Sequence, residues 1–362
     1  WTYDAYAQLG YTGFTENDGG QLLLSNVISA LQVDPLTGNC SSGAAGCVGL
    51  DVFGGFGAPS KAALNYITSP SLTQGYTREL VVSGALTGDL GAWGVQSPWA
   101  KSPVALSLGA EYRQEQLSIL PDLANQQGYL IGGSQSPPIN GAYNVTEGFT
   151  EVRVPLIQGM PFAEDLTLNG GFRYSSYNLS GANVTYKYGA EWQPIDDVKF
   201  RGSFERAVRA PNILELFSPA ILGLFAAQDP CSAKGTPNAV VAHNCATAPG
   251  RANVPAAQVG SGLINCPASQ CVQYTGGNLA LRPESADTRT FGVVFTPTFL
   301  DGFTATVDYF DIKVQNAVGQ IDPQTILTNC YGPSATAASQ AAFCPYIFRT
   351  AGTHSIAVNT TQ

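Results

Sequence analysis

Apolar and polar side chains alternate at every second position in many segments of this chain. The pattern is clearest in residues 104–112, 166–174, 184–192 and 303–309. Because successive side chains of a β-strand point to opposite faces, each of these segments would have one apolar and one polar face. The alternation therefore predicts an all-β protein built from two-faced strands.

Two architectures fit this alternation. The apolar face would be the core of a β-sandwich, whereas in a transmembrane barrel it would meet lipid and the polar face would line the lumen. The apolar rows contain small residues that would leave holes in a sandwich core, namely Ala110, Gly170, Ala190 and Ala305. They also tend to end in aromatic residues, as a barrel's interfacial girdle does, namely Tyr112, Tyr174, Trp192 and Tyr309. The pattern favours an antiparallel transmembrane β-barrel.

Short and long connections alternate along the chain. The compact ones are residues 89–102, 157–165, 193–198 and 296–302, and the long ones are 13–74, 118–145, 211–285 and 316–353, with 180–181 as a short exception. Antiparallel strands that cross a bilayer show this arrangement, with short periplasmic turns on one side and long extracellular loops on the other. We expect about ten strands, at residues 1–12, 75–88, 103–117, 146–156, 165–178, 182–193, 197–209, 286–296, 302–315 and from near 354.

Composition limits the possible partners. A net charge of -9 and a pI near 4.7 argue against nucleic acid, which requires a basic surface. No apolar run reaches the ~18–20 residues of a transmembrane helix. The first residues, WTYDAY, have neither the basic start nor the apolar stretch of a signal peptide. We therefore expect the sequence to be an internal part of a longer mature protein.

All eight cysteines lie in the long connections. An even number of cysteines confined to loops indicates disulfides in an oxidising compartment. Because neighbours in one loop are the easiest to join, the expected pairs are Cys40–Cys47, Cys231–Cys245, Cys266–Cys271 and Cys330–Cys344. A metal site is the alternative, since Cys231, His243 and Cys245 include plausible zinc ligands.

Two segments join a predicted strand to a distinctive loop sequence. Residues 200–217 read FRGSFERAVRAPNILELF, and residues 276–297 read GGNLALRPESADTRTFGVVFTP. The pair resembles the late barrel of TonB-dependent outer-membrane transporters, whose strands carry R-A-x-R-A-P-N-x-x-E-L-[FY] and then G-N-x-x-L-x-P-E. The residues that match, called the motif residues below, are Arg206, Arg209, Ala210, Pro211, Asn212, Glu215, Leu216, Asn278, Leu281, Pro283 and Glu284.

The motif residues are expected to shape the barrel rather than to bind a ligand. Pro211 cannot donate to a strand ladder and would end its strand, and residues 213–217 would follow as a short helix capped by Asn212. Arg206 falls on the lipid-facing row near the extracellular end, where lipopolysaccharide phosphates could accept its charge. Glu284 belongs to a structural corner that begins the return strand.

The polar rows contain charges of both signs, at Glu111, Arg113, Glu115, Glu147, Glu151, Arg153, Arg173, Lys187, Glu191, Arg201 and Glu205. The resemblance implies a plug domain inside the barrel, so these side chains would pair with that plug. Pairing with one another across the wall is equally consistent with the sequence. Both interpretations remain open.

The resemblance implies that residues 1–362 are one section of a ~22-stranded plugged barrel, with the N-terminal plug and the terminal strands outside it. It also implies a receptor of the bacterial outer membrane that imports a scarce solute, such as a ferric siderophore or another large nutrient. The implied partners are the TonB energy-transducing complex, the protein's own plug, outer-membrane lipid and lipopolysaccharide, and a small-molecule or metal-chelate cargo.

Catalysis has little support. The chain has only two histidines, His243 and His354, and no obvious catalytic set, so we expect no enzyme and no cofactor. Aromatic residues in the loops would mostly pack on one another, and a few would form a recognition surface. They are Phe53, Phe56, Tyr66, Tyr129, Tyr143, Tyr274, Phe343 and Tyr346. Two other classes remain as alternatives, namely a passive outer-membrane porin and a secreted β-sandwich binding protein.

Overall fold

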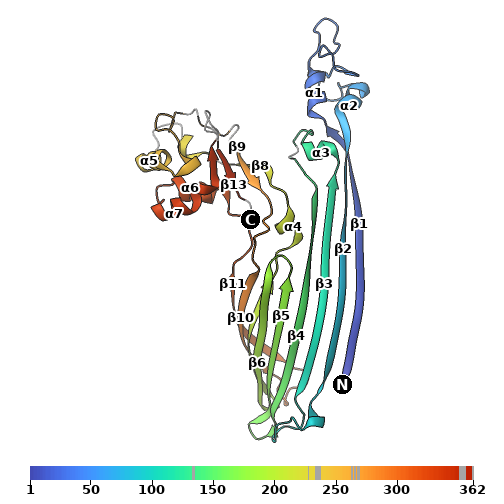
Figure 1. The fold of residues 1–362 in the computed structure, drawn as a ribbon, viewed down its shortest axis with the longest axis vertical. Coiled ribbons are helices and arrows are strands. Elements are labelled where there is room, and N and C mark those ends of the chain that lie inside the picture. The colour runs from blue at the N-terminus through green and yellow to red at the C-terminus, as the bar shows by residue number, and fades with distance from the viewer. Residues whose placement is uncertain are drawn as a thin grey trace.

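The chain forms one tall, curved wall of antiparallel strands with folded extensions at one end (Figure 1). The computed structural model describes residues 1–132, 135–226, 228–232, 238–261, 264, 266, 270–349 and 356–360. The wall is a nine-stranded sheet in the order β1-β2-β3-β4-β5-β6-β7-β10-β11. Wall strands that follow one another along the chain are therefore neighbours in space, and β1 and β11 are the two edges of this section.

The wall strands occur in the predicted order and lie close to the predicted residues. The wall strands are β1 (Thr2–Leu22), β2 (Thr68–Asp89), β3 (Ala105–Pro121), β4 (Ile139–Met160), β5 (Ala163–Tyr177), β6 (Gly181–Ile195), β7 (Val198–Arg209), β10 (Glu284–Phe295) and β11 (Ala305–Gln315). A separate four-stranded sheet contains β8 (Ile221–Ala226), β9 (Gln270–Thr275), β12 (Ile347–Arg349) and β13 (Ile356–Asn359). The helices are α1 (Leu24–Leu31), α2 (Lys61–Ile67), α3 (Leu123–Gln127), α4 (Ile213–Phe217), α5 (Ala239–Thr247), α6 (Pro323–Tyr331) and α7 (Ala337–Phe343).

The strand register gives the wall two different faces. Leu168 pairs with Ala190, Ala190 with Gly202, and Gly202 with Phe291, so the apolar rows lie side by side on one face, called the outer face below. The charged rows lie on the opposite, inner face. Tyr188 is 58% exposed on the outer face, and within the described residues no second sheet covers it. This exposed apolar face fits the lipid-facing side of a barrel wall better than the buried core of a β-sandwich.

The connections differ at the two ends of the wall, as the sequence predicts. At one end the turns between β4 and β5 and between β6 and β7 are residues 161–162 and 196–197. At the other end the connections are residues 23–67 between β1 and β2, 122–138 between β3 and β4, the short turn 178–180 between β5 and β6, and 210–283 between β7 and β10. We call these the short-turn end and the long-loop end.

Several predicted strand ends are corrected. The alternation predicts a loop over 13–74, but β1 continues to Leu22 and β2 begins at Thr68. The added ladder includes the pairs Thr15–Gln74 and Asp18–Ser71, which are polar on both faces. Because both faces of this extension meet water, it has no apolar row that alternation could reveal. The next loop is also shorter than predicted, since β3 runs to Pro121 and β4 begins at Ile139, and here the added ladder includes the apolar pair Ile119–Ile139.

The predicted tenth wall strand is wrong. Its expected start near residue 354 lies outside the described residues. Ile356–Asn359 forms β13 of the small sheet instead, antiparallel to β12 and parallel to β9. The order of this sheet, β12-β13-β9-β8, joins the two strands of the segment after β11 to the two strands of the connection after β7, with β13 beside β9.

These two segments fold together into one body, called the loop module below (residues 221–275 and 323–359). Its core includes the fully buried side chains Val254, Leu327, Tyr331 and Val358. In Figure 1 the loop module lies beyond the ends of β10 and β11, with α5, α6 and α7 on its far side. At the opposite edge of the wall, residues 23–67 form a smaller extension with α1 and α2. No helix in the described ranges has both the length and the apolar composition to span a bilayer.

Candidate functional site

Several motif residues meet at the rim, where β7 leaves the wall and β10 enters it. Arg209 Nε donates to Glu284 Oε2 at 2.7 Å, and its two terminal nitrogens donate to the carboxylate of Glu215 at 3.0 Å. Glu284 Oε1 also accepts from Val318 N at 2.5 Å. This cluster, called the rim clamp (Arg209, Glu215 and Glu284), joins the ends of β7 and β10, helix α4 and the segment after β11.

Backbone contacts reinforce the rim clamp. Asn212 Oδ1 accepts from Glu215 N at 2.8 Å and Glu215 Oε2 accepts from Asn212 N at 2.7 Å, a capping box that begins α4 as predicted. Asn278 N donates to Glu215 O at 2.8 Å. A Cβ on Gly277 would lie 2.7 Å from that same carbonyl oxygen. The return segment can therefore approach α4 this closely only because residue 277 has no side chain.

Arg206 is paired within the wall. Its Nε and Nη2 donate to the two carboxylate oxygens of Asp287 at 2.7 and 2.8 Å, and Asp287 is its direct partner on β10. Arg206 therefore has a partner within the wall, and lipopolysaccharide phosphates as a further partner stay a prediction. The other motif residues occupy packing positions, with Pro211 and Leu216 buried and Ala210, Leu281 and Pro283 half-buried.

Ion pairs cover part of the inner face. They are Arg113–Glu115, Arg173–Glu147, Lys187–Glu151, Lys199–Glu191 and Arg201–Asp308. In contrast, Glu111, Arg153 and Glu205 take part in none of the ion pairs formed among the described residues. Pairing across the wall thus accounts for some of the predicted inner charges, and pairing of the remaining three with a plug stays a prediction.

One of these pairs depends on a glycine. Arg201 on β7 and Asp308 on β11 both lie opposite Gly292 of β10, and Arg201 Nη2 reaches the two oxygens of Asp308 at 2.8 and 2.7 Å. A Cβ on Gly292 would lie 2.9 Å from Arg201 Nε and closer still to Asp308. The missing side chain therefore allows a charge pair to form across a whole strand.

The cysteines form Cys40–Cys47, Cys231–Cys245, Cys266–Cys271 and Cys330–Cys344, the neighbouring pairs expected from the sequence. The last three pairs lie in the core of the loop module. Because Cys231 and Cys245 are joined to each other, neither is a thiolate that could bind zinc beside His243. The zinc alternative is therefore removed, and we interpret these bonds as braces of the loop structure.

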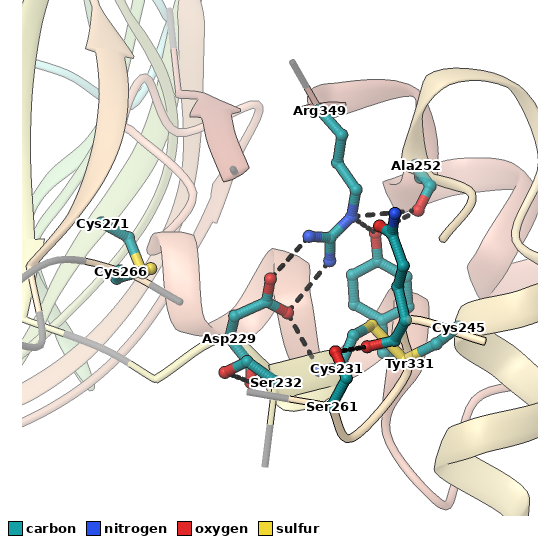
Figure 2. A network of polar contacts seen from close by, with 11 residues as sticks. Asp229, Cys231, Ser232, Cys245, Ala252, Ser261, Cys266, Cys271, Tyr331 and Arg349 are labelled. Carbon is teal, nitrogen blue, oxygen red and sulfur yellow. Dashed lines mark hydrogen bonds and ion pairs between the residues drawn. A yellow bond between two sulfur atoms is a disulfide. The ribbon is translucent and has the colours of Figure 1, made fainter. Parts of the chain in front are cut away.

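A buried ion pair joins the two segments of the loop module (Figure 2). Arg349 Nη1 and Nη2 donate to the carboxylate of Asp229 at 2.5 and 3.0 Å, and both side chains are 1% exposed. Arg349 Nε donates to Tyr331 Oη at 3.2 Å, and Tyr331 Oη donates to Ala252 O at 2.6 Å. Burial raises the pKa of Tyr331 to about 12. Cys231 N completes the carboxylate's shell at 2.9 Å.

Asp229, Tyr331 and Arg349 were not among the residues predicted from the sequence. Asp229 lies in an irregular segment, Tyr331 is the last residue of α6 and Arg349 ends the three-residue strand β12, so no periodicity marks these positions as buried. One signal was available, because Arg349 is the single basic residue between positions 316 and 353. A lone cation in a long, nearly uncharged loop is a candidate for a specific partner, although the sequence cannot show that the partner is about 120 residues away in the chain.

The predicted loop aromatics divide into packed and exposed residues. Phe343 packs against the core of the loop module, and Tyr143 contacts Tyr177 with ring centroids 6.2 Å apart. Phe53 and Phe56 are the clearest exceptions, at 97% and 111% exposure. Tyr274 lines a pocket of about 430 Å³ on the small sheet, beside Phe348, whose ring lies 4.7 Å from the Arg251 guanidinium. Such a surface can hold a planar or anionic group.

A wall of neighbouring antiparallel strands, with an exposed apolar face and a charged inner face, defines a section of a transmembrane β-barrel. The family described as "TonB dependent receptor-like, beta-barrel" matches residues 3–355. The chain belongs to this family.

Solved structures of receptors from the same class are similar to the chain. A mutant of the ferric enterobactin receptor PfeA of Pseudomonas aeruginosa, in complex with enterobactin, is 15% identical with a TM-score of 0.49, and the match covers 99% of this chain and 36% of that one. The siderophore receptor PirA of Acinetobacter baumannii is 12% identical with a TM-score of 0.45, covering 99% and 37%. The Serratia marcescens hemophore receptor HasR, with its hemophore and heme, is 13% identical with a TM-score of 0.42, covering 70% and 35%. The chain therefore spans little more than a third of these receptors.

Proposed function

We propose that this chain is part of an outer-membrane receptor that imports a scarce solute, such as a ferric siderophore or another large nutrient, with energy from the TonB complex. The observation that carries the proposal is the match of residues 3–355 to the TonB-dependent receptor barrel. Translocation makes and breaks no covalent bond. We therefore assign no catalytic residue and no cofactor to the chain.

In this proposal the long-loop end faces the outside of the cell and the short-turn end faces the periplasm. The asymmetry of the connections supports this orientation, since outer-membrane barrels have short periplasmic turns and longer extracellular loops. The disulfides of the loop module suit an oxidising environment. The pocket beside Tyr274 and the exposed rings of Phe53 and Phe56 are then candidates for the first contact with cargo.

A plug inside the barrel is part of the same proposal. Glu111, Arg153 and Glu205 point to the inner face without an ion-pair partner among the described wall residues. Glu205 also lines an inner pocket of about 370 Å³ together with Arg113, Arg173 and Lys187. Charges that are left unpaired at a closely packed interface destabilise it. A plug with complementary charges at these positions would remove that cost.

The test uses the full-length receptor in bacterial cells that lack their own copy. Uptake of labelled ferric siderophores and heme is measured with and without TonB, and with and without a protonophore. We expect uptake of at least one cargo to require the receptor, TonB and the proton gradient together. Receptor-dependent uptake at the same rate without TonB and in the presence of the protonophore would instead indicate a passive porin.

A wall variant separates the plug from the import mechanism as a whole. Glu205→Lys reverses an inner charge that has no wall partner, whereas Lys199→Gln removes an exposed charge that is paired with Glu191 at 3.5 Å. We expect Glu205→Lys to lower TonB-dependent uptake, with the barrel still folded, and Lys199→Gln to leave it near the wild-type rate. Normal uptake by Glu205→Lys would contradict plug pairing at this residue and leave TonB dependence intact.

A further inference from the structure

The outer face becomes charged toward the long-loop end on three neighbouring strands. On β7, β10 and β11 an aromatic residue of the apolar row is followed, at the next outer position toward the long-loop end, by a charged residue. The three steps are Phe204 to Arg206, Phe291 to Arg289, and Tyr309 to Asp311. Aromatic girdles mark the edge of the hydrocarbon layer, so these charges lie at the level of lipid headgroups.

A crevice of about 590 Å³ opens on the outer face beside this boundary. The small residues Ala190 and Gly202, which pair directly with each other, leave the space. Leu168, Tyr188 and Phe204 border it, and the rings of Tyr188 and Phe204 stack with centroids 5.3 Å apart. An apolar crevice on a lipid-facing surface is a place where an acyl chain can lie in van der Waals contact.

Two exposed cations lie near the crevice, and each faces a carboxylate on the neighbouring strand without forming an ion pair with it. Arg289 lines the crevice edge, and neither Arg289 nor Lys313 is in any ion pair of the described residues, whereas the nearby Arg206 is neutralised by Asp287. Arg289 faces Asp311 across the strands and Lys313 faces Asp287. Arg289 and Lys313 are therefore diagonal neighbours, roughly 7–8 Å apart at the backbone. One phosphate group can accept hydrogen bonds from two such side chains.

We propose that this crevice and the pair Arg289 and Lys313 bind one phosphate-bearing lipid of the outer leaflet. The acyl chain lies in the crevice over Ala190 and Gly202, against the stacked rings of Tyr188 and Phe204, and the phosphate bridges the two cations. The cations Arg206, Arg289 and Lys313 outnumber the anions Asp287 and Asp311, so the cluster favours an anionic headgroup. The site depends on the proposed outward orientation of the long-loop end but not on any cargo.

The test measures lipid binding to the full-length receptor, purified in detergent, by native mass spectrometry with lipid A as the probe. Arg289→Gln with Lys313→Gln should weaken binding by about thirtyfold, equivalent to ~2 kcal/mol at 1.36 kcal/mol per factor of ten. Gly202→Leu tests the crevice separately. A Cβ at residue 202 would have Thr290 O as its nearest neighbour at 3.6 Å, so the wall can accept the change while the longer side chain fills the space.

The matched control is Arg78→Gln. Arg78 is also exposed and faces outward beside Tyr11, but it lies on β2, away from the crevice. We expect it to leave lipid binding unchanged, and heat-dependent migration in gels checks that every variant is folded. Dephosphorylated lipid A should bind as weakly as the probe binds to the double variant, and inorganic phosphate should not displace the probe. Unchanged binding in the double variant, an equal loss with Arg78→Gln, or displacement by inorganic phosphate would each overturn the proposal.

Discussion

Removing the buried carboxylate of Asp229 should destabilise the loop module more than any loss of a surface charge. Asp229→Asn keeps the shape of the side chain but leaves the cation of Arg349, whose side chain is 1% exposed, without its counter-ion. Breaking a buried ion pair from one side costs about 3–5 kcal/mol, because the remaining charge stays in a low-dielectric environment. At 1.36 kcal/mol per factor of ten, the open population of the module should rise about 10²–10⁴-fold.

Hydrogen exchange of the full-length receptor in detergent measures this opening directly. Peptides that contain β9 and β13 report on the module, because these strands pair with each other and contain the buried residues Cys271 and Val358. Peptides from β4 and β5 report on the wall. We expect protection to fall in the module and to stay unchanged in the wall, since the Asp229–Arg349 pair lies within the module (Figure 2).

Two further variants decide whether the charge pair is the cause. Arg251→Gln removes another arginine of the same module, which is exposed and contacts the ring of Phe348, and should cost only about 0.5–1 kcal/mol. Asp229→Leu with Arg349→Met removes both charges together and should cost less than Asp229→Asn, because no buried charge remains. A change in protection below tenfold for Asp229→Asn, or one no larger than for Arg251→Gln, would refute the reasoning.

Three other predictions concern the rim and the loops. Gly277→Ala places a Cβ 2.7 Å from Glu215 O and should lower the stability of the rim by about 1–3 kcal/mol, which faster proteolysis near residues 276–283 would show. In the control Gly319→Ala the new Cβ meets no atom within 4 Å, so this variant should have no effect. Burial acts to raise the pKa of Asp122, but its hydrogen bonds from Asn125 N and Leu72 N outweigh this and lower it. Asp122 should therefore stabilise the segment 122–138 above the pKa of the unfolded carboxyl, and this stabilisation should disappear as the pH falls through the lower folded pKa. Hydrogen exchange of this segment should show that pH dependence in the wild type and lose it in Asp122→Asn. Cys330→Ser with Cys344→Ser opens a crosslink with a sequence separation of 14 and should cost about 2–5 kcal/mol in module stability, measured by the same exchange experiment.

The wall could be predicted from the sequence because a bilayer imposes a simple rule on it. Where both faces are constrained, as in β5 and β6, alternation identifies the strands almost to the residue. Where lipid no longer constrains a strand, the alternation of apolar and polar residues disappears. For this reason the polar ladder from Thr15 to Asp18 was predicted as loop. The cap of α4 was predictable for a different reason, because Asn212 and Glu215 stand three positions apart and contact each other locally.

The loop module could not be predicted because its contacts join distant parts of the chain. Asp229 and Arg349 belong to different connections, and the intervening wall strands β10 and β11 carry their own, unrelated pattern. Short strands such as β12 and β13 have too few residues to show a period. The local disulfide spacing is readable in the sequence, but the pairing of β9 with β13 is not.

The joining of strands from both loop segments in one small sheet determines how the two segments can move. The parallel pairing of β13 with β9 places strands of both segments side by side, and Tyr331 and Val358 are buried in the same core as Cys231 and Val254. Neither segment can leave without exposing that core and breaking the Asp229–Arg349 pair, so opening of one segment also destabilises the other. The chain that leads from β11 into the second segment is also held at the rim clamp, where Glu284 of β10 accepts from Val318 N. We therefore expect the exchange experiment on Asp229→Asn to show protection falling in β8, β9, β12 and β13 together; loss confined to β12 and β13 would mean that the loop after β11 opens independently.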